Sequence, residues 1–184
     1  MRSTEKLETR LERVTMHEFF LKRINKAIAG QNYIEASWLV YACLENRYFR
    51  TIAKIKEYCK YSHGRCKKSG NELALRTKIG CLQRLYEAGC PCILNAFDQN
   101  LFDETKKWVK ERNVLMHNLL RLDDYENIDE QFKEIAIRGS QILDRTYACC
   151  TEFRKLYYNK EYEFVFPEEA MEKCSCKPNL NKAE

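Results

Sequence analysis

The sequence predicts an all-α protein, an up-and-down bundle of four long helices and one shorter helix. The chain of 184 residues holds only six glycines and three prolines, the residues that most often interrupt helices. Apolar residues recur at every third or fourth position in five separate segments, which is the helical period. Hydrophobic residues make up 45% of the chain, enough for one packed core at this length.

Two long helices and a shorter one are expected in the first half of the chain. The first spans 3–29, where the apolar pattern ends at Gly30. The second spans 32–58, with one apolar stripe that consists of Ile34, Trp38, Tyr41, Tyr48, Ile52 and Ile55. Glycine and polar residues predict a loop over 59–71, and a shorter helix over 72–88 ends before Gly89.

Two further long helices follow. The first of them spans 99–121, with Asp98 or Asn100 as its N-cap. The second carries the clearest repeat, which runs for about eight turns through Ile128, Phe132, Ile135, Gly139, Ile142, Thr146, Cys149, Phe153 and Leu156. We therefore expect one domain over residues 1–158 and a C-terminal tail over 159–184 that is partly extended or disordered.

The composition limits the class of protein. No stretch approaches 18 consecutive apolar residues, and the first eight residues are too charged for a signal peptide. We expect a cytoplasmic protein that does not enter membranes. Ten cysteines in such a chain are expected to be reduced thiols. Cys59, His63 and Cys66 lack the paired spacing of a zinc knuckle, so neither a metal nor a cofactor is expected.

Arg112 interrupts the apolar face of the helix expected over 99–121. At about 100° per residue, Leu101, Trp108 and Leu119 fall within about 40° of Arg112. An unpaired cation in such a position costs several kcal/mol. Either a carboxylate or an open polar cleft must therefore compensate it.

Other polar residues accompany Arg112. Asn113 and His117 lie one turn apart on the edge of the same face. Glu45 interrupts the apolar stripe of the second helix, with Arg47 nearby. One hypothesis is that Glu45 pairs with Arg112 or Arg47 and orients that residue for function. The alternative is an ion pair that serves structure alone.

The stretch Trp108-Val109-Lys110-Glu111-Arg112-Asn113-Val114-Leu115-Met116-His117 resembles the signature of the HEPN domain family. That signature is an Arg, commonly followed by Asn, with a His four to six residues further on. The second helix, from Glu35 to Arg47, also resembles the second helix of the family. The resemblance covers about residues 5–157 by the order and length of the helices, and it implies a HEPN-like bundle.

The resemblance implies a metal-independent endoribonuclease whose site forms between the signature helices of a homodimer. His117 would transfer protons, Arg112 would hold the phosphate, and Asn113 would orient His117 or bind a phosphate oxygen. The product would be a 2′,3′-cyclic phosphate. Proteins of this kind occur as toxins in toxin–antitoxin or phage-defence systems, which implies a nucleotidyltransferase-type antitoxin as a further partner.

Basic residues cluster between the second and third helices. Lys60, Arg65, Lys67 and Lys68 lie there with Tyr58 and Tyr61, a composition suited to the phosphates and unpaired bases of RNA. The alternative for this segment is a solvated loop.

Two other functions stay open at this point. Relatives of this type also act as non-catalytic bundles that bind nucleotides or partner proteins. A purely architectural bundle, in which Arg112 and Glu45 form a structural pair, is the third possibility.

Overall fold

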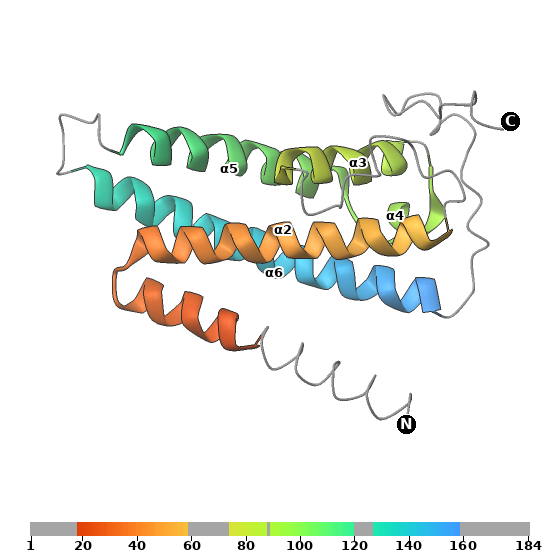
Figure 1. The fold of residues 1–184 in the computed structure, drawn as a ribbon, viewed down its shortest axis with the longest axis horizontal. Coiled ribbons are helices and arrows are strands. Elements are labelled where there is room, and N and C mark those ends of the chain that lie inside the picture. The colour runs from red at the N-terminus through yellow and green to blue at the C-terminus, as the bar shows by residue number, and fades with distance from the viewer. Residues whose placement is uncertain (1–17, 59–73, 88, 120–126, 159–184) are drawn as a thin grey trace, which may run out of the picture.

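The computed structural model describes residues 18–58, 74–87, 89–119 and 127–158. Within these ranges the chain forms helices joined by turns, without a strand, so the all-α prediction is confirmed there. A helix over 18–29 precedes α2 (Tyr33–Tyr58), α3 (Leu75–Glu87), α4 (Pro91–Leu94), α5 (Gln99–Asn118) and α6 (Ile128–Tyr158) (Figure 1). Residues 3–17 of the first expected helix and the tail over 159–184 lie outside the described ranges.

Local signals set the ends of several helices where the sequence predicts them. Asp98 caps α5, because its side chain accepts a 2.7 Å hydrogen bond from the backbone N–H of Leu101. Gly89, with φ of 77°, ends α3, and the adjacent N–H of Cys90 bonds back to the carbonyl of Leu85. The short helix α4 was not expected; it begins at Pro91, a residue favoured in the first turn of a helix.

The direction of α3 differs from the expected up-and-down order. The backbone of Leu75 lies close to the Tyr41 hydroxyl, and Glu45, one turn later, pairs with Lys78. Both helices therefore advance in the same direction, and α3 lies along only part of α2 (Figure 1). Two helices that run in the same direction need a connection about as long as the helix it passes back along. Residues 59–74 are numerous enough for this, since an extended chain spans about 3.3 Å per residue.

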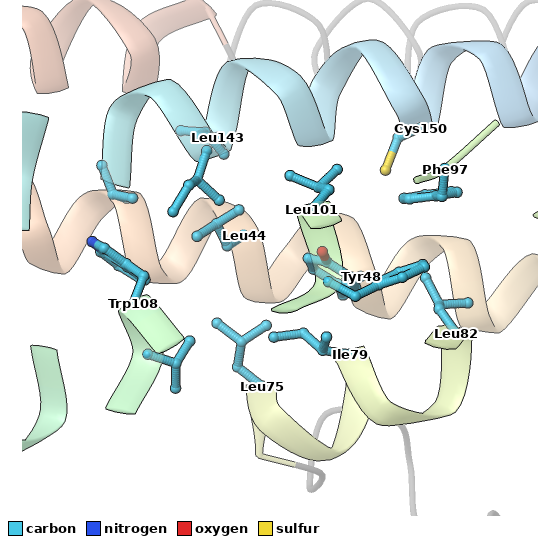
Figure 2. Close-up of a cluster of buried hydrophobic side chains, with 14 of the residues drawn as sticks. Leu44, Tyr48, Leu75, Ile79, Leu82, Phe97, Leu101, Trp108, Leu143 and Cys150 are labelled. Atoms are coloured by element: carbon cyan, nitrogen blue, oxygen red, sulfur yellow. The ribbon is translucent and has the colours of Figure 1, made fainter. Parts of the chain in front are cut away.

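The core lies where α2, α3, α5 and α6 meet. Leu44 and Tyr48 from α2, Ile79 from α3, Leu101 from α5 and Leu143 from α6 are all fully buried and share one cluster (Figure 2). On α2, however, the predicted stripe is wrong at its first two members. Ile34 is 37% exposed and Trp38 is 55% exposed, because the buried residues of this half of the helix follow the line Ala36, Val40 and Leu44.

Trp108 and Gly139 fix the close approach of α5 to α6. The Trp108 side chain is fully buried, and its indole N–H donates a 2.8 Å hydrogen bond to the carbonyl of Ile135. A Cβ at Gly139 would lie only 2.6 Å from Cζ2 of the indole. Glycine is therefore needed at this crossing, one turn of α5 before Arg112.

The described helices include none with the length and low charge that crossing a lipid bilayer requires.

Candidate functional site

Arg112 lies in the position that the helical period predicts for it. The residue is only 7% exposed and belongs to the buried face of α5. Its guanidinium carbon lies 4.9 Å from the ring centroid of Trp38 and 4.9 Å from that of Tyr41. Two aromatic rings of α2 therefore form a slot for this cation, and cation–π attraction stabilises it there.

Within the described residues, most of the hydrogen-bonding capacity of the Arg112 guanidinium is unused. Nη1 donates to Oδ1 of Asn113 at 3.1 Å, whereas Nε and Nη2 are buried without a hydrogen-bond partner. Burial lowers the pKa of Arg112, and the Tyr41 hydroxyl opposes that shift; arginine nevertheless stays protonated at neutral pH. An unsatisfied buried donor reduces stability by about 1–3 kcal/mol. The site therefore holds a cation that lacks hydrogen-bond acceptors for most of its donors.

Asn113 and His117 occupy different positions relative to Arg112. Asn113 is half-buried and contacts the guanidinium directly. His117 is exposed in the last turn of α5. Helix geometry separates it from Arg112 by about 7.5 Å along the axis and about 140° around it. The structure thus brings Arg112 and Asn113 together and directs His117 toward solvent.

The sequence suggests that Glu45 pairs with Arg112 or Arg47. In the structure it pairs with neither of them. Its carboxylate accepts a 2.9 Å hydrogen bond from Nζ of Lys78, whose side chain is 2% exposed. The pairing follows from the direction of α3, which places Lys78 opposite Glu45. The bonds and burial therefore favour the structural role of Glu45 over the orienting one.

Arg47 also has a partner of its own. Its guanidinium lies 3.7 Å from the ring centroid of Tyr147 on α6 and donates a hydrogen bond to the hydroxyl of that residue. Burial lowers the pKa of Arg47 to about 10. Arg47 thus joins α2 to α6 rather than supporting the site at Arg112.

Tyr41 lies between the Lys78–Glu45 pair and Arg112. Burial raises the pKa of Tyr41 and the charge of Glu45 adds to this, whereas the charge of Arg112 lowers it. Sequence reasoning placed Tyr41 and Trp38 in the core stripe and did not single out Lys78. The usable signal was two aromatic residues three positions apart, with Glu45 one turn after Tyr41.

The outer side of the aromatic slot is exposed in the described part of the chain, because Trp38 is 55% exposed. α3 begins at Leu75, beside Tyr41, so the earlier turns of α2, which carry Trp38, extend past it (Figure 1). A separate groove of about 280 Å³ between α5 and α6 is lined by Lys110, Glu111, Val114, Leu115, Asn118 and Gln131. It includes none of the predicted catalytic residues.

Two other sequence predictions concern ligands. Among the described residues, no group of three or more His, Cys, Asp or Glu side chains could hold a metal ion. The predicted RNA-binding residues Lys60, Arg65, Lys67 and Lys68 lie outside the described ranges.

Comparisons with protein-family models, with curated proteins and with solved structures give no match.

Proposed function

We propose that this protein is a metal-independent endoribonuclease, with Arg112, Asn113 and His117 as the catalytic residues. One observation carries the proposal: among the described residues, Nε and Nη2 of the buried Arg112 guanidinium have no hydrogen-bond partner, and no carboxylate binds the cation. Phosphate, like carboxylate, can accept two parallel hydrogen bonds from such a planar cation. The exposed imidazole on the same helix, at the spacing that resembles the HEPN signature, adds the proton-transfer group.

The chemistry requires two proton transfers and a stabilised phosphorane. The RNA 2′-oxygen attacks phosphorus and loses its proton to a base, the bond from phosphorus to the 5′-oxygen breaks, and an acid protonates that leaving oxygen. The products are a 2′,3′-cyclic phosphate and a free 5′-hydroxyl. The His117 imidazole suits the proton transfers, and Arg112 suits the added negative charge at phosphorus. Asn113, which accepts from Nη1, orients the guanidinium.

A homodimer is part of this proposal. His117 lies about 140° around the helix from Arg112, so one α5 presents the two groups in different directions. Two α5 helices that face each other across a twofold axis would place the imidazole of each copy toward the guanidinium of the other. Acid and base would then come from separate copies in the same cleft.

The test is cleavage of labelled single-stranded RNA by the purified protein in EDTA. We expect the wild type to cut and to leave cyclic phosphate ends. His117→Ala and Asn113→Ala should lose at least about a hundredfold in rate, with unchanged circular dichroism and sedimentation. Val114→Ala, which truncates an exposed residue of the same helix, serves as the control. Normal cutting by both catalytic variants would refute the assignment.

A non-catalytic nucleotide-binding bundle is the second candidate, because the unpaired donors of Arg112 would serve the phosphate of a free nucleotide equally well. Nucleotide binding without RNA cleavage in the same assay would favour it. A toxin in the cytoplasm, held by a nucleotidyltransferase-type antitoxin, is the context that the resemblance implies. Toxicity on expression that His117→Ala relieves would support that context.

A further inference from the structure

Trp38 is a large aromatic side chain on the surface of the described structure. It is 55% exposed, and Ile34, one turn earlier on α2, is 37% exposed. The only other tryptophan, Trp108, is fully buried. Tryptophan and arginine are both enriched among the residues that contribute most of the binding energy at interfaces.

The position of Trp38 relative to Arg112 indicates what it binds. The indole ring lies 4.9 Å from the guanidinium carbon, so a ligand that reaches the cation also reaches the ring. A nucleotide offers both complements, a phosphate for the guanidinium and a base for the ring. Bases stack well on aromatic side chains when they are unpaired, since both faces of a paired base are already stacked within a duplex.

We propose that Trp38 is a stacking platform for an unpaired base next to the phosphate that Arg112 holds. This inference rests on the proposed function and names the substrate class of the same site as single-stranded RNA. Nε and Nη2 of Arg112 are shielded from solvent in the free protein. A phosphate that reaches them displaces the exposed indole from the guanidinium, and the displaced indole then stacks on the base.

A second copy of the chain fits this patch less well than RNA does. Ile34 and Trp38 supply far less area than the roughly 800 Å² per partner that a stable interface buries. A twofold contact centred on Trp38 would also bring the Arg112 guanidinium of each copy toward the other without a counter-charge. An anionic ligand removes that repulsion.

The experiment measures binding separately from cleavage. The His117→Ala protein, which is expected to bind without cutting, is titrated in EDTA with a 12-nucleotide single-stranded RNA and with the same RNA in duplex form. Anisotropy of a fluorescent label on the RNA measures the affinity of every variant, and tryptophan fluorescence of the parent protein reports on Trp38, because Trp108 is shielded in the core. Trp38→Leu removes the platform. Phe19→Leu is the matched control, since Phe19 is also 55% exposed but lies on the first helix.

We expect single-stranded RNA to quench the fluorescence and duplex RNA to bind more weakly. Trp38→Leu should weaken single-strand binding by about ten- to a hundredfold, Trp38→Phe by less, and Phe19→Leu by less than about twofold. Unchanged RNA affinity in Trp38→Leu would overturn the inference while cleavage by the wild type upholds the proposed function. An affinity loss that disappears at higher protein concentration, together with a shift to monomer, would show that Trp38 contacts a second copy instead. Absence of both binding and cleavage would remove both proposals.

Discussion

Replacing Gly139 by alanine tests the packing that positions the candidate site. The added methyl would lie 2.6–2.8 Å from three indole atoms of Trp108, and this ring is fully buried and hydrogen-bonded to Ile135. Overpacking of this kind costs about 1–3 kcal/mol, and a strained indole bond adds up to about 1 kcal/mol. The helical preference of alanine returns about 1 kcal/mol. These contributions sum to about 0–3 kcal/mol, and we expect the free energy of unfolding to fall by about 1.5 kcal/mol, the middle of that range.

Gly80 provides the matched control for this change. It lies inside α3, and a Cβ there would meet only Nη1 of Arg84, at 3.9 Å. Gly80→Ala should therefore raise the free energy of unfolding by about 0.5–1 kcal/mol. With a urea dependence of about 2 kcal/mol per molar, the Gly139→Ala midpoint should fall by about 0.5–1 M and the Gly80→Ala midpoint should rise. Equal or greater stability of Gly139→Ala relative to wild type would refute the close crossing of α5 and α6.

Three further predictions concern charged and titratable groups. Arg112→Met should raise the free energy of unfolding by about 1–2 kcal/mol, because it removes unsatisfied buried donors, and it should abolish RNA cleavage. Urea unfolding measures the stability and the cleavage assay measures the activity. A variant less stable than the wild type would contradict the stability prediction. Glu45→Gln should lower the free energy of unfolding by about 2 kcal/mol, because it leaves the buried Lys78 ammonium without its carboxylate. The double change Glu45→Leu with Lys78→Met should restore most of this free energy, as measured by urea unfolding. A double variant as unstable as Glu45→Gln would refute the structural role of the pair. Burial raises the pKa of Cys149 from 9.0 to about 11 and also raises that of Cys150. As the pH rises, the thiols therefore lose their protons in the unfolded chain before they do so in the folded protein. Stability that is fully present below pH 9 should decline between pH 9 and about pH 11, which appears as a falling melting temperature. Substitution of both cysteines by alanine should make that decline smaller.

The inward position of Arg112 and the cap at Asp98 were predictable because both are local. The first needs only the 3.6-residue period, and the second needs only a side chain that reaches the first turn of its own helix. The end of α3 at Gly89 is of the same kind, since glycine readily adopts a positive φ. These features depend on residues within a few positions of one another.

The misplaced stripe of α2 has a physical cause in its small polar residues. Ser37 and Thr51 are buried, and each hydroxyl bonds to a carbonyl of the preceding turn, of Ile34 at 2.9 Å and of Arg47 at 3.0 Å. A hydroxyl satisfied in this way packs as a small apolar group, whereas pattern analysis assigns it to the surface. The error rotated the expected stripe and placed Trp38 inside.

The partner of Glu45 was not predictable from spacing. Lys78 reaches it only because α3 runs in the same direction as α2, and direction depends on packing between segments far apart in the chain. The aromatic slot likewise forms between α2 and α5, from Trp38 and Tyr41 on one side and Arg112 on the other, more than 70 positions apart in the sequence. Local periodicity identified the cation but not the rings that hold it.

The unpaired donors of the Arg112 guanidinium give the folded protein the capacity to bind an anion. Folding brings this charge out of water and leaves the N–H groups of Nε and Nη2 without a hydrogen-bond partner among the described residues. An oxyanion that enters the slot recovers hydrogen-bond energy that folding forfeited, and it displaces no resident acid in doing so. The unsatisfied donors of Arg112 thus have two effects: the protein binds a phosphodiester tightly, and the bundle is less stable while the slot holds no ligand.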